Sequence, residues 1–145
     1  MAASPIQLTL SHHQTSEGLA YQLLAIVLTS SDRIITPQDL KDLRLPAALD
    51  PREGVVISGR APVWLSVYLA HECHPTAWVA CFDPRLGAVV TFTHTHAVRV
   101  GRIIPLEELS LEPPSIQPNI ASNLGPALLV VGPPDNSLWR LFIVH

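Results

Sequence analysis

Two short segments of the sequence carry side chains that could do acid–base and phosphate chemistry. They are residues 71–75 (HECHP) and residues 83–87 (DPRLG). The residues between them, 77–82, form a continuous apolar run, which is typical of a buried parallel strand. Six extended residues span roughly 20 Å, so an intact strand keeps His74 away from Asp83 within one copy. Either the two side chains do different jobs, or they meet across copies of the chain.

Each of these side chains has a chemical interpretation and an ordinary one. Arg85 could contact a phosphoryl oxygen while Asp83 holds a divalent ion or orients the attacking hydroxyl, with Pro84 fixing the backbone between them. The alternative is a turn closed by an ion pair. His74 could act as a general acid or base in phosphodiester cleavage. The alternative is a histidine that is favoured at a helix C-terminus by the helix dipole.

A third candidate site follows from the order of the predicted elements. Gly59 and Arg60 come between a predicted strand (55–58) and a predicted helix (62–73), where Arg60 and nearby backbone amides could hold a phosphate. The alternative is an arginine in a surface ion pair. With strand 77–82, these elements make a βαβ unit with parallel strands and a right-handed crossover. We therefore expect Arg60 and Asp83 to lie at the same edge of the sheet.

The remaining elements complete a small α/β domain. We expect strands at 6–10, 21–28 and 88–92, the last in a hairpin with strand 77–82, and a short helix from Thr36 to Leu43. The predicted fold is a small Rossmann-like mixed sheet with a central βαβ unit. The remaining histidines are assigned to a loop, in the case of His12 and His13, and to one face of a strand, in the case of His94 and His96. For the second pair a polar strand face is favoured over a metal site.

The predicted domain spans residues 1–104. Residues 105–145 are expected to be a proline-rich linker followed by a hairpin of strands 128–131 and 138–144. The hairpin turn, residues 132–137 (GPPDNS), resembles the start of a phosphate-binding P-loop, but Ser137 and Leu138 stand where that loop needs Gly and Lys. We therefore predict no nucleoside triphosphate site.

Composition limits the partners of the chain. Of the 145 residues 48% are hydrophobic and 14% charged, which is apolar for a small monomer and predicts a surface that meets a partner subunit. The net charge of −3 argues against binding long duplexes, and we expect neither DNA nor a membrane as partner. The chain has one lysine and eight arginines, enough to hold a small anionic ligand.

The cysteines and the termini indicate a cytoplasmic protein. Cys73 and Cys81 flank strand 77–82, too far apart to bridge, and the C-x2-C spacing of a zinc site is missing. We therefore expect free thiols in a reducing compartment. We also predict no signal peptide and no membrane-spanning segment.

Four segments together resemble one family, the small ring nucleases of type III CRISPR systems, which are distant relatives of the CRISPR-associated Rossmann (CARF) fold. The segments are 59–64 (GRAPVW), 71–75, 78–80 (WVA) and 83–87. The resemblance covers roughly residues 6–104. It implies degradation of cyclic tetra-adenylate, the second messenger that switches on CRISPR effector nucleases, to linear di-adenylate.

The resemblance also implies a cofactor, an assembly and residue roles. The activity is expected to need Mn²⁺ near Asp83, in homodimers that stack on either side of the ring and split the active site between them. Some relatives carry a C-terminal ATPase-like domain, of which residues 105–145 could be a remnant. The implied catalytic residues are His74, Asp83 and Arg85, and the implied ligand-binding residues are Ser58, Gly59, Arg60 and His94.

Three other functions remain compatible with the sequence. The chain could be a binding module that senses or sequesters cyclic oligoadenylate without cutting it. It could be a manganese-dependent exonuclease on RNA 3′ ends, although the net charge of −3 argues mildly against long RNA. It could also be a dimerisation domain for an ATPase partner.

Overall fold

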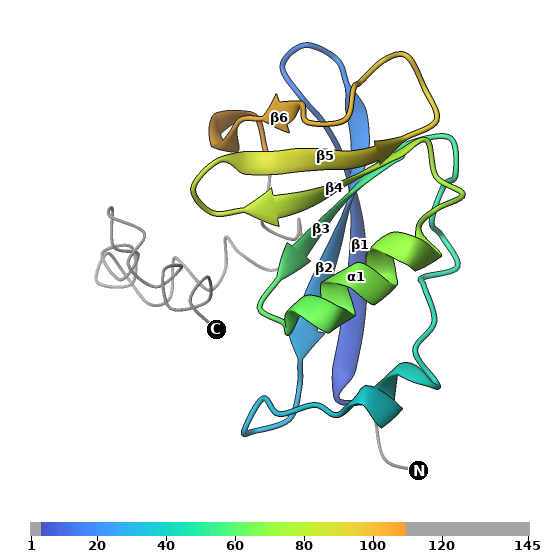
Figure 1. The fold of residues 1–145 in the computed structure, drawn as a ribbon, viewed down its shortest axis with the longest axis vertical. Coiled ribbons are helices and arrows are strands. Elements are labelled where there is room, and N and C mark those ends of the chain that lie inside the picture. The colour runs from blue at the N-terminus through green and yellow to red at the C-terminus, as the bar shows by residue number, and fades with distance from the viewer. Residues whose placement is uncertain (1–3, 110–145) are drawn as a thin grey trace, which may run out of the picture. The chain divides into compact units, whose positions relative to one another are not determined.

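The computed structural model describes residues 4–109, which form one six-stranded mixed sheet with an α-helix on one face (Figure 1). The predicted α/β class is confirmed, and the architecture is compatible with a small Rossmann-like fold. The strands follow one another in space as in the sequence: β1 (Ile6–Gln14), β2 (Ala20–Leu28), β3 (Gly54–Gly59), β4 (Trp78–Asp83), β5 (Gly87–Thr93) and β6 (Ile103–Ile104). The helix is α1 (Val63–Glu72), and two short 3₁₀ helices are η1 (Pro37–Leu40) and η2 (Leu106–Glu108).

Parallel strands occupy the middle of the sheet. Strands β2, β3 and β4 run parallel, whereas β1, β5 and β6 are antiparallel to their neighbours. Because α1 connects β3 to β4, the predicted βαβ unit is present, and the predicted hairpin of β4 and β5 is confirmed. The chain between β2 and β3 makes a second crossover, which passes through η1.

Two apolar layers lie on the two faces of the sheet. Strand β3 feeds both, because successive side chains of a strand point to opposite faces: Val55 and Ile57 belong to one layer and Val56 to the other. Helix α1 covers the first layer through Leu65 and Leu69, which are 0% and 1% exposed. The second layer is centred on side chains such as Tyr21 and Trp78. This double burial explains the continuous apolar runs of the central strands.

Helix α1 is apolar on its outer face as well. Val63 and Val67 are 72% and 62% exposed, so the helix packs on the sheet through one face only. The helix has ten residues, and none of the helices in residues 4–109 is long and apolar enough to span a bilayer.

The first strand is longer than predicted. Pairing of β1 with β2 continues through His12 and His13, opposite Gln22 and Tyr21, so the prediction that these histidines lie in a loop is wrong. The His13 ring stacks on Tyr21, with ring centroids 5.4 Å apart. Polar residues persist in β1 because the strand is at the sheet edge and its hydrogen bonds come from β2.

The fifth strand covers the predicted residues 88–92 but ends before the two histidines that were expected on a strand face. The strand ends at Thr93, so His94 and His96 lie in a loop. The prediction that they lie on one face of a strand is wrong. Threonine side chains divert the backbone here. The Thr93 hydroxyl donates to Thr95 O at 3.0 Å, and Ala97 N donates to Thr95 Oγ1 at 3.1 Å. Such local side-chain bonds compete with strand pairing.

The predicted helix from Thr36 to Leu43 is only one turn long. Thr36 N donates to the Asp39 carboxylate at 2.7 Å, so the predicted start is right. The turn then closes by the i to i+3 bond from Lys41 N to Gln38 O, which is 3₁₀ and not α geometry. Of the segment 105–145, only the first five residues are described; the predicted hairpin at 128–144 lies outside the described residues.

Both cysteines are free thiols, as predicted. Burial, followed by the charge of Glu72, raises the pKa of Cys73 to about 12. Burial also raises the pKa of Cys81. Because the thiolate is the nucleophile and the metal ligand, these protonated thiols are structural.

Alanine substitutions on the two faces of α1 should have unequal effects on stability. Leu69→Ala should lower the free energy of unfolding by about 2–5 kcal/mol, because it empties a buried site. Val67→Ala should change it by less than about 0.5 kcal/mol, because the side chain is exposed. Urea denaturation of the full chain measures both. Equal losses in the two variants would contradict the packing of α1 described above.

Candidate active site

The parallel strands bring three strand ends to one edge of the sheet, the carboxyl edge. Ile26 of β2 pairs with Gly59 of β3. Ile57 of β3 pairs with Cys81 of β4, so Gly59 and Asp83, each two residues later, continue the same row. The predicted shared edge for Arg60 and Asp83 is therefore observed. Neighbouring strands lie about 4.8 Å apart, so this row extends roughly 10 Å from β2 to β4.

Asp83 and Arg85 form a two-point ion pair at the end of β4. Arg85 Nη2 lies 3.1 Å from Asp83 Oδ2, and Arg85 Nε lies 3.3 Å from Asp83 Oδ1. The backbone N–H of Arg85 also donates to Oδ1, at 2.7 Å. Arg85 remains 66% exposed at its side chain and Asp83 26%. Since a guanidinium has five N–H donors, Arg85 keeps donors for a phosphate while Asp83 fixes its orientation.

The ion pair keeps the Asp83 carboxylate charged. The side-chain hydrogen bond from Arg85 lowers the pKa of Asp83 below its ordinary value. Burial opposes this shift, and the hydrogen bond from the Arg85 backbone N–H adds to it. In return Asp83 raises the pKa of Arg85. A carboxyl with a depressed pKa stays ionised until the pH falls below the usual aspartate range. Asp83 is therefore an acceptor, and not a proton donor, at neutral pH.

The same local geometry occurs a second time in the chain. Residues 50–52 are also Asp-Pro-Arg, and Arg52 contacts the Asp50 carboxylate through its backbone N, Nε and Nη2 at 2.9, 3.1 and 3.0 Å. This second motif precedes β3, at the opposite edge of the sheet. The motif is thus a self-contained turn, and its place at the carboxyl end of a parallel strand is what makes Asp83-Pro-Arg85 a candidate site.

A metal at Asp83 would find few other protein ligands in one copy. Residues 4–109 contain no cluster of three or more His, Cys, Asp or Glu side chains that could hold an ion. Both Asp83 oxygens already accept bonds from Arg85. The carboxylate suits Mg²⁺ or Mn²⁺, ions that proteins often hold by one or two carboxylates together with substrate phosphates. The residues therefore fit an ion that binds together with the substrate, and do not fit a metal ion bound by protein ligands alone.

The predicted ligand-binding residues divide between two edges. Ser58, Gly59 and Arg60 form the end of β3 and the following turn, beside the row just described. Gly59 has a φ of +140°, and a Cβ there would lie 2.6 Å from Ile26 O, so glycine is needed for this close approach of β3 to β2. Arg60 and Arg33 line a common pocket. The sequence analysis did not single out Arg33, although its place after β2, a strand parallel to β3, was the signal available.

His94, the other predicted ligand residue, lies at the amino edge, where β2, β3 and β4 begin. Its Nε2–H donates to His74 O at 3.0 Å, and its ring meets the His74 ring edge-on with centroids 5.1 Å apart. Both imidazoles pack on Phe92, each with its centroid 4.5 Å from the phenyl ring. His94 is thus placed to position His74, whose ring stays exposed.

The turn after α1 also fixes His74. Its backbone N donates to His71 O at 3.1 Å. Two residues later, the Thr76 hydroxyl is within 2.7 Å of Cys73 O and 3.2 Å of Trp78 O. Thr76 and Cys73 are both buried. The turn is therefore anchored below while the imidazole of His74 faces solvent.

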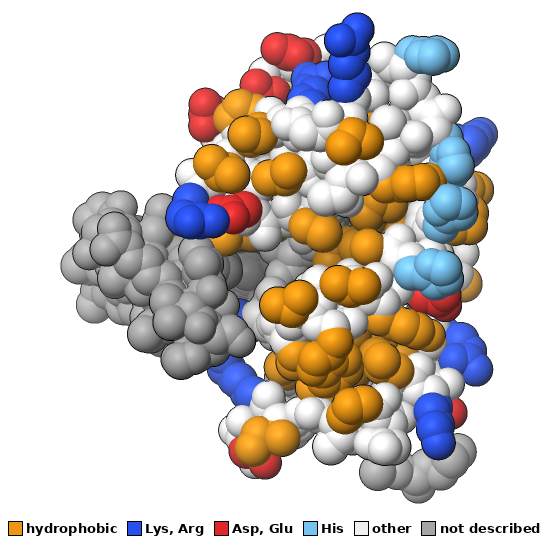
Figure 2. All heavy atoms as spheres, viewed as in Figure 1, with side chains coloured by type: hydrophobic (Ala, Val, Ile, Leu, Met, Phe, Trp, Pro, Cys, Tyr) orange, Lys and Arg blue, Asp and Glu red, His pale blue; other side chains and the backbone are white. Residues whose placement is uncertain are grey.

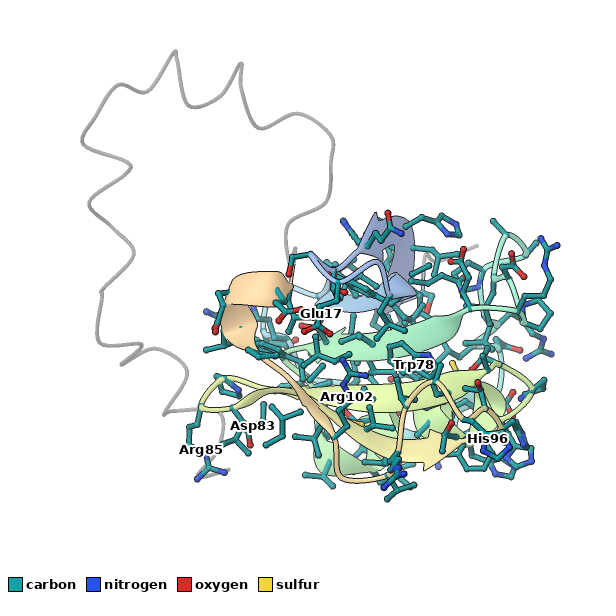
Figure 3. All side chains as sticks on the ribbon, turned by 90° about the horizontal axis from the view of Figure 1, so that it is seen from above. Glu17, Trp78, Asp83, Arg85, His96 and Arg102 are labelled. Atoms are coloured by element: carbon teal, nitrogen blue, oxygen red, sulfur yellow. The ribbon has the colours of Figure 1, made fainter. Side chains whose placement is uncertain are left out.

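The amino edge is rich in histidine, whereas the carboxyl edge is not. Figure 2 shows His side chains along one side of the molecule, and Figure 3 shows His96 at the opposite end of the sheet from Asp83 and Arg85. Strand β4 is intact between His74 and Asp83, so the two lie roughly 20 Å apart. All six histidines of residues 4–109 are at the amino edge: His12, His13, His71, His74, His94 and His96.

Comparison with known proteins identifies the family. The family described as CRISPR-associated protein (Cas_csx3) matches residues 28–105, more than half of the chain. The chain belongs to the Cas_csx3 family of CRISPR-associated proteins. It is also 42% identical over 79 residues to a protein of Aquifex aeolicus (strain VF5) described as an uncharacterized protein. That alignment covers 52% of this chain and 71% of the relative.

The part of the chain that matches the Cas_csx3 family contains both edges. It begins at the last residue of β2 and runs past β6, so it includes Arg60, His74, Asp83 and Arg85. The CRISPR association expected from the resemblance is therefore confirmed at the level of the family.

Arginine substitution should move the titration of one aspartate and leave the other unchanged. In Arg85→Ala, the pKa of Asp83 should rise from its depressed value towards the usual aspartate range near about 4, because the side-chain donors are gone. Asp50, whose pKa is lowered chiefly by the side-chain hydrogen bond from Arg52, should keep its lowered pKa in that variant. In the matched Arg52→Ala variant the two aspartates should exchange behaviour. Carboxyl-carbon NMR titrations measure both. An Asp83 titration unchanged by Arg85→Ala would refute the ion pair.

Proposed function

We propose that this protein is a ring nuclease that cleaves cyclic tetra-adenylate to linear di-adenylate and so switches off type III CRISPR defence in the cytoplasm. The observation that carries the proposal is the Asp83–Arg85 pair at the carboxyl edge, beside Arg60, in the segment that matches the Cas_csx3 family. The fold proposed by the resemblance, a CARF-like domain, is compatible with the mixed sheet.

The residues at the carboxyl edge suit phosphoryl chemistry. The exposed donors of Arg85 can stabilise the charge that develops on the phosphorus oxygens in the transition state. Asp83 holds that guanidinium by two contacts. Mn²⁺, when bound there with the substrate, would supply further positive charge to neutralise the phosphate. Ser58, Gly59 and Arg60 are proposed to hold the ligand at the same edge.

Proton transfer is assigned to His74. The nucleophile is the neighbouring ribose 2′-hydroxyl or water, and His74 moves a proton to or from the reacting oxygen. His94 contacts the backbone carbonyl and the ring of His74. We therefore propose that His94 contributes to ligand binding at the amino edge.

A site assembled from two copies reconciles these assignments with the length of β4. Because His74 and Asp83 are at opposite ends of an intact strand, one copy supplies Asp83 and Arg85 and another supplies His74. We therefore propose homodimers that stack on either side of the ligand.

Turnover should depend on metal and on both edges. The wild-type chain should convert labelled cyclic tetra-adenylate to linear di-adenylate with Mn²⁺ and not with a chelator. His74→Ala and Asp83→Ala should each lower the rate at least about 100-fold, as expected for loss of a group acting in the transition state. Two control variants should keep the wild-type rate. His71→Ala removes a histidine near His74, and Asp50→Ala removes the aspartate of the second Asp-Pro-Arg motif.

The same assay separates the other functions. Tight binding without conversion would favour a sensor or a sequestering module. Cleavage of linear RNA 3′ ends in preference to the ring would favour an exonuclease. Neither binding nor cleavage would leave only a role in dimerisation.

A split site also predicts complementation between inactive variants. In an equal mixture of His74→Ala and Asp83→Ala proteins, half of the copies have an intact Asp83 edge and the other half have an intact His74 edge. If copies associate at random, about a quarter of the assembled sites contain both intact edges. Activity should therefore return to roughly 25% of wild type. A mixture as inactive as its components would mean that His74 and Asp83 act within one copy or not together.

A further inference from the structure

A pocket with a volume of about 180 Å³ lies at the carboxyl ends of β2 and β3. One wall is the apolar end of β2, residues 26–28, and the other residues lining the pocket are Arg33 and Arg60. Carboxyl ends of parallel strands are the usual ligand sites of open α/β sheets. Guanidinium groups fit phosphate oxygens by paired hydrogen bonds. The composition of the pocket therefore suits a phosphate with an apolar group attached.

The backbone of Arg33 has a conformation that residues other than glycine rarely adopt. Its φ is +56°, in the left-handed region that is costly for most residues. The surrounding turn enforces this backbone. Arg33 N donates to Ser30 O at 3.0 Å, Ile34 N donates to Asp32 Oδ1 at 3.1 Å, and the Ser30 hydroxyl donates to Ile34 O at 3.3 Å. Backbone strain of this kind at a pocket is a reason to test for function.

The charges at this edge favour the pocket as the place for an anion. Asp83 and Arg85 neutralise each other as a pair. The Asp32 carboxylate accepts a hydrogen bond from Ile34 N within its own turn, and none of residues 4–109 forms an ion pair with Arg33. The close approach at Gly59 brings the residue after it, Arg60, to the end of β2. Arg33 thus brings to the pocket a guanidinium that no carboxylate of residues 4–109 pairs with, and Arg60 lines the same pocket.

We propose that Arg33 and Arg60 form a second phosphate subsite, which holds a phosphate of the substrate that is not cleaved while the end of β2 packs against the adjoining sugar or base. The subsite lies two strands from Asp83, roughly 10 Å away. It rests on the proposed function and adds a requirement on the substrate, which must be an oligonucleotide with at least two phosphates so that both strand ends are occupied.

Binding of labelled cyclic tetra-adenylate in the presence of a chelator tests the subsite without turnover. Arg33→Asn removes the guanidinium and suits the left-handed backbone, so the fold should be retained, with an unchanged or higher unfolding temperature. We expect binding to weaken roughly 10- to 100-fold, the usual effect of losing a charged hydrogen-bond pair. The salt dependence of binding should also decrease, because one phosphate contact is lost.

Three further measurements make the test specific. Arg33→Lys, which keeps the charge without the paired donors, should bind with intermediate affinity. Arg44→Ala removes a charge from the crossover outside the pocket, where Arg44 Nη1 donates to Lys41 O and Leu43 O, and this variant should bind as wild type. AMP, which has a single phosphate and can occupy only one of the two strand ends, should compete poorly with the ring.

The outcomes separate the subsite from the proposed function. Wild-type affinity and salt dependence in Arg33→Asn, with cleavage intact, would overturn the subsite alone. Binding that weakens in Arg33→Asn while the wild type fails to cleave would support the subsite and overturn the nuclease. A wild-type protein that binds no oligoadenylate would overturn both.

Discussion

The parallel register of β2, β3 and β4 is the constraint on which the other features depend. Parallel pairing aligns the carboxyl ends of three strands, so that Ile26, Gly59 and Asp83 share one row. The same pairing sends the starts of the strands, and with them His74, to the opposite edge. The two apolar layers stabilise this register because a shift by one residue would exchange the side chains that face each layer. The distribution of arginines and histidines is thus a consequence of the core.

The two Asp-Pro-Arg motifs separate local structure from location. Both fold into the same turn with the same three contacts to the carboxylate, because the atoms involved lie within two residues of each other. Nothing in the motif itself distinguishes Asp83 from Asp50. The difference arises from the strand that each motif adjoins, which only the sheet topology defines. A short pattern therefore describes a geometry, and the fold decides whether that geometry faces a ligand.

The sequence was most informative where local signals and burial agree. The run from β3 through α1 to β4 was predicted within a residue or two, because its apolar runs and Pro62 mark the elements. The polar end of β1, with His13, was missed because its strand conformation depends on pairing with β2. Arg33 was missed for a similar reason: its left-handed φ is imposed by neighbouring side chains in the turn, and no glycine marks it. What escaped prediction depends on contacts and not on residue type.

The length of β4 has a consequence for how the chain can vary. Side chains alternate between the two faces of a sheet along a strand, so inserting one residue would move every side chain after the insertion to the opposite face. An insertion of two would keep the faces but move Asp83 roughly 6.6 Å further from His74. The length of β4 is therefore constrained twice: by the packing of its side chains in the two apolar layers, and by the distance between the amino and carboxyl edges. The part of the β2–β3 crossover that follows the Arg33 turn does not connect the two edges in this way, and its length can change without altering the distance between them.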